Sequence, residues 1–433
     1  MQTLNAVGQR VPDVADAAVF AKTFNAVQEL IRSGLVTAGH DVGSGGLITT
    51  LLELCFADNS IGAEVDLTAL GRDAVAVLFA ENAAVVLQMK TQGEDMLAAQ
   101  NIDYRKIGTV DGSGEMKVCI GESRFTFSIP EMRDTWFSTS YLFDTKQSGE
   151  EKARERFENY KKQPLRFVFP AQFDGKLPVQ PAVRPKAAIL REKGSNSERE
   201  MAHAMHLAGF EVRDVHMTDL ISGRETLEDI SFIGAVGGFS NSDVLGSAKG
   251  WAGAFLYNEK ARTALENFFA RPDTLSVGIC NGCQLFIELG LINPTHDKKP
   301  RMLHNESGKH ESGFTSVRIS DNNSVMLSSL AGSTLGVWIS HGEGRFDLPY
   351  EESKYDIVAK YAYEGYPANP NGSHFDIAMM ADATGRHLVM MPHIERSIFQ
   401  WNWAHYPDGR ADEVSPWIEA FVNARKWVEG FGL

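Results

Sequence analysis

Apolar and polar positions alternate with a regular pattern from residue 185 to the end of the chain. Short apolar runs predict strands at 186–190, 210–215, 232–236, 275–279, 337–339 and 387–391. Between the runs, apolar residues recur at helical spacing and predict helices over 197–208 and 281–289. Strands and helices in alternation are typical of an α/β fold with a mainly parallel sheet and helices on both faces. In such folds, sites gather at the carboxyl ends of the strands.

The first 145 residues show a different pattern. Helices are predicted over 14–33 and 47–56, and strands follow at 74–79, 84–88, 106–110, 116–120 and 125–129, which indicates an α+β domain. Dense mixed charges over 148–162 predict a solvated helix face, and a proline-rich stretch to residue 185 predicts an extended path. We therefore expect a first domain over 1–145, a connector over 146–184 and a second domain over 185–433.

Composition narrows the class of protein. A chain of 433 residues, 43% hydrophobic and 23% charged, has the composition of a globular protein with about two or three domains. Its formal net charge of −14 argues against a nucleic-acid partner, because binding to phosphates needs basic residues. No apolar run is long enough to span a membrane, and the N-terminus has no signal-peptide pattern. Four cysteines do not make a disulfide framework, so the cytoplasm is the expected compartment.

One junction from strand to helix carries candidate chemistry. Cys280 lies between the apolar run 275–279 and the amphipathic stretch 281–289, with Gly278 and Gly282 on either side. This is the pattern of a nucleophile elbow, with cysteine in place of serine. A helix N-terminus favours a thiolate and offers backbone N–H groups to an oxyanion. The elbow is therefore a candidate nucleophile.

Two other interpretations of this cysteine stay open. Cys280 can be a buried structural residue, or it can pair with Cys283 as a redox C-x-x-C motif or as half of a zinc site. A zinc site needs two more ligands, and the remaining cysteines, Cys55 and Cys119, lie far upstream. The redox interpretation is the stronger of these alternatives, because reactive thiol pairs occur at helix starts.

A histidine and a carboxylate follow the last predicted strand. Pro392 ends that strand, and His393 and Glu395 come next in what we expect to be an extended loop, where side chains two residues apart point the same way. A carboxylate can fix the tautomer of an imidazole that activates a thiol. Standing alone, the pair would be a solvated loop feature. Together with Cys280 it predicts a Cys-His-Glu triad.

The segment Gly278-Ile-Cys280-Asn-Gly282-Cys-Gln284 resembles the G-x-C-x-G-x-Q elbow of class I glutamine amidotransferases. Further segments resemble, in the same order, one family within that group, the large single-chain formylglycinamide ribonucleotide amidotransferases. These segments are Arg191–Glu200, Gly237-Gly-Phe-Ser240 with its sequel to Trp251, His341-Gly-Glu-Gly344, Asn369–Ser373 and Trp401–His405. The resemblance implies an α/β amidotransferase domain over 185–433.

The resemblance also implies roles for single residues. Cys280, His393 and Glu395 match the catalytic triad, with Ile394 in place of a proline common in the family. Backbone N–H groups of the oxyanion hole would come from Asn281 and the segment Gly238-Phe239. Two further residues, Gln284 and His341, would bind glutamine. Polar residues near the glutamine pocket would be Asn305, Ser307 and Glu311.

The first domain carries a resemblance of its own. Residues 40–47, His-Asp-Val-Gly-Ser-Gly-Gly-Leu, are similar to the H-D-x-S-D-G-G-L segment in the C-terminal domain of aminoimidazole-ribonucleotide-synthetase-like proteins. His40 and Asp41 would then contact substrate, phosphate or magnesium. This sequence departs from the pattern, with Gly43 for serine and Ser44 for the second aspartate, which puts a ligand role at position 44 in doubt. Taken without the resemblance, the glycines predict only close strand–helix packing.

The resemblance spans nearly the whole chain but only the C-terminal part of a longer enzyme. It implies an ATP-dependent C–N ligase of purine biosynthesis, which transfers ammonia from glutamine to formylglycinamide ribonucleotide. ATP and Mg²⁺ would serve the full-length enzyme, and no covalently bound cofactor is expected. The missing N-terminal domains would be partners. Two other functions remain open: an assembly module inactive without those domains, and a thiol-redox protein that uses Cys280 and Cys283.

Overall fold

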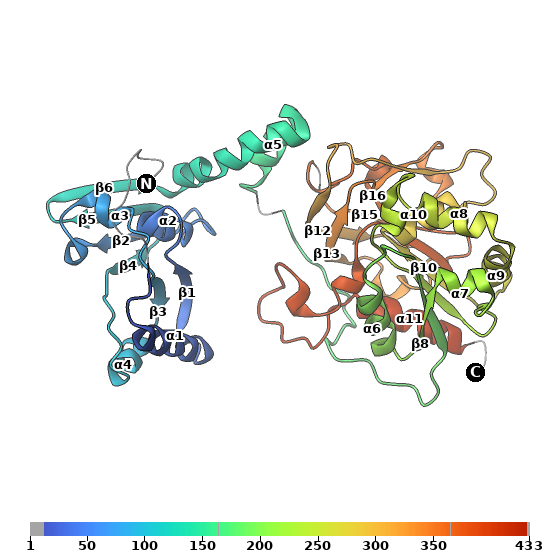
Figure 1. The fold of residues 1–433 in the computed structure, drawn as a ribbon, viewed down its shortest axis with the longest axis horizontal. Helices are drawn as coiled ribbons and strands as arrows, with labels where there is room; N and C mark the ends of the chain where they lie inside the picture. Colours follow the sequence, from blue (N-terminus) through green and yellow to red (C-terminus); the bar gives the residue numbers. More distant parts are fainter. Residues whose placement is uncertain (1–12, 163, 364, 431–433) are drawn as a thin grey trace. The chain divides into compact units, whose positions relative to one another are not determined.

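The computed structural model describes residues 13–162, 164–363 and 365–430. It divides the chain into two compact units, Met1–Leu142 and Phe143–Leu433, each with its own buried apolar side chains (Figure 1). The expected fold class is confirmed: an α+β unit precedes a larger α/β unit. The functional domain limits 1–145, 146–184 and 185–433 stay predictions.

The first unit combines short helices with two small sheets. Strands β1 and β3 pair antiparallel, and four strands form a second sheet in the order β4-β2-β5-β6. Side chains from α2, β2 and β5, including Leu51, Val65 and Val118, form its main core, and α1 and α4 enclose a smaller one. Its elements are α1 (Ala17–Arg32), β1 (Val36–Asp41), α2 (Gly46–Glu53), β2 (Gly62–Asp66), α3 (Ala74–Leu78), β3 (Val85–Met89), α4 (Gln92–Ala99), β4 (Gly108–Asp111), β5 (Glu115–Ile120), β6 (Ser123–Ser128) and the start of α5 (Ile129–Asn159).

One predicted strand of this unit is wrong. The predicted strand 74–79 is instead the short helix α3 (Ala74–Leu78), which Phe79 ends. Asp73 caps its first turn, because the Asp73 carboxylate accepts hydrogen bonds from the backbone N–H groups of Val75 and Ala76. The apolar run Ala-Val-Ala-Val-Leu fits a buried strand or a buried helix equally well, and the cap decides for the helix.

A nine-stranded mixed sheet forms the centre of the second unit. Its order is β13-β12-β15-β16-β17-β10-β9-β7-β8. Neighbours are parallel from β8 to β17 and antiparallel from β17 to β13, so the sheet is less uniformly parallel than expected. The strands are β7 (Lys186–Arg191), β8 (Glu211–His216), β9 (Phe232–Ala235), β10 (Leu275–Ile279), β12 (Glu311–Ile319), β13 (Thr334–His341), β15 (Asp356–Tyr361), β16 (Ile377–Ala381) and β17 (His387–Met390), and β11 (Arg301–Leu303) pairs with β14 (Arg345–Asp347) outside this sheet.

Two groups of helices pack around this sheet. One group pairs α6 with α11, and the other joins α8 to α9 and α10 (Figure 1). All residues of β9, β10 and β17 are buried, as expected for central strands covered on both faces. The helices are α6 (Glu198–Ala208), α7 (Met217–Ser222), α8 (Lys249–Tyr257), α9 (Glu259–Ala270), α10 (Asn281–Glu288) and α11 (Ile418–Glu429).

The parallel half of the sheet brings three strand ends together. β10 pairs in parallel with β9 on one side and with β17 on the other. Their carboxyl ends therefore lie at the same edge of the sheet, where residue 237 follows β9, Cys280 follows β10 and residue 393 follows β17.

The region predicted as a connector is partly built into the second unit. Helix α5 is interrupted at Gly149, whose φ of +82° and ψ of 164° are not helical. The Arg156 guanidinium pairs with Asp144 across this interruption, with 2.9 Å from Nη1 to Oδ2. Farther along, Val168 pairs with Thr334 of β13, and Phe173 is buried. The expectation of a solvated helix face is therefore wrong for Arg156, which makes the contacts described below.

Candidate active site

Cys280 occupies the sharp turn between β10 and α10. Its φ of +53° and ψ of −105° are unusual for a residue other than glycine, and only 5% of its surface is exposed. The backbone N–H of Cys280 donates to the carbonyl of Met390, which fixes the turn to β17. Sγ lies 3.5 Å from the carbonyl oxygen of Ser340. The structure thus has the backbone geometry of the predicted elbow.

Two glycines permit this close packing. A Cβ on Gly282 would lie 2.0 Å from the carbonyl oxygen of Ala235, so only glycine lets α10 start against the end of β9. A Cβ on Gly237 would lie 2.8 Å from Cε1 of His393 and 3.5 Å from Cβ of Cys280. The strand ends are therefore packed tightly enough to bring the histidine and the cysteine side by side.

His393 and Glu395 meet as expected, although not in an extended loop. Residues Ile394–Arg396 form the short 3-10 helix η7, so the two side chains converge by turning rather than by alternation along a strand. Nδ1 of His393 lies 2.6 Å from Oε1 of Glu395, and both residues are at least 97% buried. The backbone N–H of His393 donates to the carbonyl of Trp338, which ties the turn to β13.

Buried charges set the protonation of this pair. Burial lowers the pKa of His393, but the Glu395 carboxylate and Cys280 outweigh burial and raise the pKa to about 10. Burial raises the pKa of Glu395, and the imidazolium outweighs this effect and lowers it. Near neutral pH the site therefore holds a carboxylate and an imidazolium beside the sulfur atom of Cys280.

A pocket of about 280 Å³ opens above the cysteine. His341, the last residue of β13, is 98% buried in its wall. Desolvation lowers the pKa of His341 to about 3, so its imidazole is neutral. The other lining residues are Gly238, Phe239, Asp243, Ser247, Gln284, His304, Gly308, Lys309, His310, Ser340, Gly342 and Glu343.

Gln284 belongs to the frame of this pocket. Its Nε2 donates to the carbonyl of Glu343 over 2.7 Å, and its Oε1 accepts from Nδ2 of Asn281 over 3.0 Å. Oδ1 of Asn281 accepts in turn from the backbone N–H of Ser240. Both amide side chains are thus engaged within the protein and join α10 to the loops after β9 and β13.

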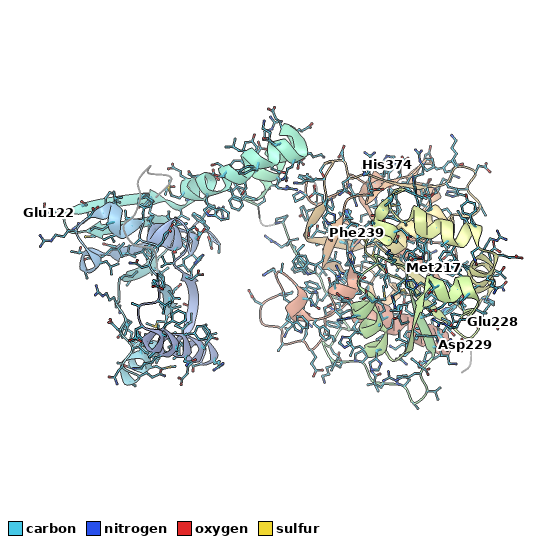
Figure 2. All side chains as sticks on the ribbon, in the orientation of Figure 1. Glu122, Met217, Glu228, Asp229, Phe239 and His374 are labelled. Atoms are coloured by element: carbon cyan, nitrogen blue, oxygen red, sulfur yellow. The ribbon has the colours of Figure 1, made fainter. Side chains whose placement is uncertain are left out.

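The candidate oxyanion hole needs one correction. The backbone N–H of Phe239 donates to the carbonyl of Gly194 over 2.9 Å, so it is not free to bind an oxyanion. Within the described residues, the N–H of Gly238 has no such acceptor, and Asn281 is the first residue of α10, where helices leave N–H groups unpaired. Phe239, which is 47% exposed and is labelled in Figure 2, lines the pocket instead.

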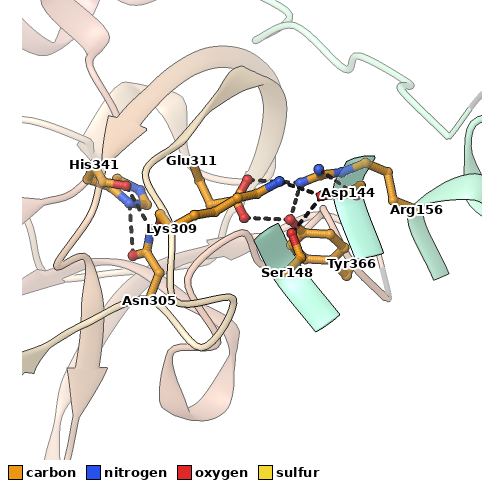
Figure 3. A network of polar contacts seen from close by, with 8 residues as sticks. All are labelled: Asp144, Ser148, Arg156, Asn305, Lys309, Glu311, His341 and Tyr366. Carbon is orange, nitrogen blue, oxygen red and sulfur yellow. Dashed lines mark hydrogen bonds and ion pairs between the residues drawn. The ribbon is translucent and has the colours of Figure 1, made fainter. Parts of the chain in front are cut away.

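Three other polar residues expected near the pocket have different surroundings. Asn305 is 97% buried and contacts His341, and Oγ of Ser307 has no hydrogen-bond partner among the described residues. The carboxylate of Glu311 is bound by Arg156 and by the hydroxyl of Tyr366 (Figure 3). Glu311 therefore holds helix α5 and is not a wall residue of the pocket.

Three charged residues that line the pocket, Asp243, Lys309 and Glu343, were not singled out from the sequence. Two of them lie within segments that resemble the family: Asp243 in the stretch from Ser240 to Trp251, and Glu343 in His341–Gly344. Lys309 lies outside every such segment, and a charged loop residue is usually solvated.

His40 and Asp41 belong to the first unit, and the structure does not bring them to a pocket. Nε2 of His40 lies 3.1 Å from the Glu53 carboxylate, and the Asp41 side chain is 83% exposed. The glycine turn beside them already binds a protein anion, because the N–H of Gly45 donates to the carboxylate of Glu81. A phosphate role for this turn stays a prediction.

The described residues show neither a metal-ligand cluster nor a membrane-spanning helix. Residues 13–162, 164–363 and 365–430 contain no cluster of three or more His, Cys, Asp or Glu side chains that could hold a metal ion. Within the same ranges, no helix has the length and apolar character needed to cross a membrane.

Comparisons with known proteins divide the chain in a similar way. A sequence model of the "CobB/CobQ-like glutamine amidotransferase domain" matches residues 184–428, more than half of the chain. A model of the "AIR synthase related protein, C-terminal domain" matches residues 2–120.

Curated relatives match nearly the whole chain. The probable phosphoribosylformylglycinamidine synthase, chloroplastic/mitochondrial, of Arabidopsis thaliana is 39% identical over 99% of this chain and 32% of the relative. The human phosphoribosylformylglycinamidine synthase is 37% identical over 99% of this chain and 35% of the relative. The chain thus spans about a third of the length of these relatives. Among solved structures, "Structure of PurLQS from Thermotoga maritima" aligns with a TM-score of 0.43 and 25% identity, over 55% of this chain and 98% of that chain.

Proposed function

The chain belongs to the family of CobB/CobQ-like glutamine amidotransferase domains, and from that premise we propose that Cys280, His393 and Glu395 hydrolyse glutamine to glutamate and ammonia. The observation that carries this proposal is the buried triad. A 2.6 Å contact joins His393 to Glu395, and the cysteine lies beside them at the end of β10. Nucleophile, base and orienting carboxylate are the three parts that acyl transfer requires.

The first half-reaction forms a γ-glutamyl thioester. The Cys280 thiolate attacks the side-chain carbonyl carbon of glutamine, and the electron pair of the C=O bond moves to oxygen. Backbone N–H groups of Gly238 and Asn281 stabilise that oxyanion. The C–N bond then breaks as the His393 imidazolium gives its proton to the leaving nitrogen, and ammonia departs.

The second half-reaction regenerates the thiolate. Neutral His393 takes a proton from water as the water oxygen attacks the thioester carbonyl. The C–S bond breaks, glutamate leaves, and the imidazolium and thiolate return to their starting state. Glu395 stabilises the imidazolium throughout and holds the ring with Nδ1–H towards its carboxylate.

We also propose that this ammonia serves a longer protein. The curated relatives are named phosphoribosylformylglycinamidine synthase, and this chain spans about a third of their length. In such a protein the ammonia would convert formylglycinamide ribonucleotide to formylglycinamidine ribonucleotide in purine biosynthesis, with ATP and Mg²⁺ bound by domains outside this chain together with the first unit. All four cysteines are free thiols, which supports the cytoplasm as the compartment.

The redox function has less support. Cys283 is fully buried, and burial together with Cys280 raises the pKa of its thiol. A resolving cysteine needs access to its partner thiol and to a reductant, and a buried protonated thiol reacts slowly.

The proposal is tested by intact-mass analysis of the chain after reaction with an electrophilic glutamine analogue, alongside assays of glutamine turnover. We expect one adduct on the wild type, glutamate release, and neither in Cys280→Ser. Cys283→Ser should still form the adduct and still release glutamate. An adduct on Cys283 would support the redox interpretation. A folded chain with no adduct and no turnover would support the inactive assembly module, especially if the missing domains restored turnover.

A further inference from the structure

Helix α5 is joined by ion pairs to the loop that lines the pocket. We call residues 304–310 the pocket loop, because His304, Gly308, Lys309 and His310 all line the pocket of Cys280. Nζ of Lys309 lies 2.7 Å from Oδ1 of Asp144 on α5. A second pair joins Lys152 of α5 to Glu306 of the pocket loop over 2.9 Å. A third joins Arg156 of α5 to Glu311, the first residue of β12, also over 2.9 Å (Figure 3).

Asn305 links this loop to His341. Its Nδ2 donates to the carbonyls of Lys309, over 2.9 Å, and of His341, over 2.7 Å. Its Oδ1 accepts from the backbone N–H of Gly344 over 3.0 Å. Because all three partners have fixed donor or acceptor roles, they determine which end of the amide is oxygen.

That orientation fixes the tautomer of His341. Nδ1 of His341 lies 3.3 Å from Oδ1 of Asn305, which can only accept, so Nδ1 must carry the hydrogen. Nε2 is then a bare acceptor. It is buried and has no hydrogen-bond partner among the described residues (His341 and Asn305 in Figure 3). A buried acceptor without a partner is costly, and a ligand N–H in the pocket would relieve that cost.

Asp144 on α5 holds the side chain of Lys309, whose backbone carbonyl binds Asn305. Asp144 is 92% buried, and its carboxylate accepts from Lys309, Ser148 and Arg156. Burial raises the pKa of Asp144, but the hydrogen bonds from Lys309 and Ser148 outweigh burial and lower it, so the carboxylate stays charged. The Lys309 side chain is itself only 20% exposed, and loss of Asp144 would leave its ammonium poorly paired.

We propose that Asp144 is a positioning residue for the glutamine pocket: through Lys309 and Asn305 it holds His341 with Nε2 ready to accept a hydrogen bond from the carboxamide N–H of glutamine. This inference rests on the proposed function, since it assigns the amide selectivity of that same site. Glutamine offers the N–H that Nε2 lacks, whereas the product glutamate and γ-esters of glutamate do not.

The test compares amide and ester substrates in the full chain. Asp144→Asn removes the charge that holds Lys309, and Glu151→Gln makes the same chemical change at an exposed site on the same helix. In Asp144→Asn we expect the ratio of kcat/KM for glutamine to kcat/KM for the γ-methyl ester of glutamate to fall roughly five- to tenfold, because the variant loses one hydrogen bond to the amide substrate only. Glu151→Gln should keep the wild-type ratio. An equal fall for both substrates, or an unchanged ratio, would overturn the proposal.

A second readout does not depend on turnover. Long-range ¹H–¹⁵N spectra of histidine-labelled protein report which ring nitrogen carries the hydrogen. We expect His341 to be the Nδ1–H tautomer in the wild type. In Asp144→Asn we expect a mixture of tautomers. Lys309→Met should give the same mixture and replaces Asp144→Asn should that variant fail to fold. A wild type with hydrogen on Nε2 would overturn the inference while leaving the triad intact. Absence of both amide and ester turnover would instead contradict the proposed function.

Discussion

At the scale of single residues, the site depends on how three buried groups share charge. Burial alone would make His393 neutral, and the Glu395 carboxylate with Cys280 reverses that effect. The result is an imidazolium that can protonate a leaving nitrogen well above neutral pH. His341 has no carboxylate partner among the described residues, and burial moves its pKa the other way, to about 3. The surroundings of the two buried histidines thus make His393 a cation and His341 neutral near neutral pH.

Glu395→Gln should expose this dependence in the pH profile. In the wild type we expect kcat/KM for glutamine to decline as pH rises through about 10, where the imidazolium loses its proton. Without the carboxylate, burial dominates, so the basic limb should move to lower pH by roughly 1–3 units. The maximal rate should fall by about 10²-fold or more, because the ring loses its orienting partner. An unshifted basic limb would contradict the role given to Glu395.

The exposed Glu228 offers a matched control (Figure 2). Glu228→Gln makes the same chemical change at an exposed residue that does not line the pocket, and its profile should match that of the wild type.

The sequence predicted a triad but did not predict how its surroundings are held in place. Cys280, His393 and Glu395 follow strand ends, and it is the combination of their residue types that indicates chemistry. Asn305 and Asp144 act through hydrogen bonds to residues 36 and 165 positions away, respectively. No local pattern encodes such pairings. The family resemblance pointed to Asn305 as a polar residue near the pocket, whereas nothing in the sequence singled out Asp144.

At the scale of elements, the turn from β10 into α10 depends on a close approach to β9. Gly282→Ala would place Cβ 2.0 Å from the Ala235 carbonyl oxygen, and backbone atoms cannot rotate away. We expect the second unit to lose about 1–3 kcal/mol or more of its free energy of unfolding, measured by urea denaturation. The adduct yield at Cys280 should fall as well, since the elbow must shift.

Gly253→Ala is the control for that substitution. Its new Cβ would have 3.9 Å to the nearest atom, in the side chain of Tyr257 on the same helix α8. Alanine favours helix interiors, so this variant should be unchanged or more stable by about 0.4–1 kcal/mol. Equal destabilisation by both substitutions would show that the close approach of α10 to β9 is not the cause.

Periodicity predicted the strands and helices next to Cys280, and it missed others, among them α4, α7, α8, α9 and α11. It also failed where local capping or turning decides. The strands and helices around the site follow runs long enough to show their period. The predicted strand 74–79 was too short for that, and the Asp73 cap made Ala74–Leu78 helical. The loop after Pro392 turns as η7, so His393 and Glu395 meet by a route that alternation does not describe. The parallel strands were recognised, whereas the antiparallel half of the sheet gave no distinguishing signal.

At the scale of the whole molecule, two units with separate cores should unfold separately. No core cluster of the described residues draws from both units. We expect calorimetry to resolve two transitions. An adduct at Cys280 stabilises only the folded second unit, so it should raise one transition temperature and leave the other unchanged. A single transition that shifts as one would contradict independent units.

The three ion pairs that join α5 to the pocket loop and to Glu311 also matter for recombinant design. The amidotransferase family match starts at residue 184, so a fragment designed from that match would begin at this residue. Such a fragment would discard Asp144, Lys152 and Arg156 together, and would leave Glu311, 95% buried, facing the Tyr366 hydroxyl without its cation. Stranding a buried charge costs about 3–5 kcal/mol. We therefore expect a piece that begins at Phe143, where the compact unit begins, to be more stable than one that begins at residue 184.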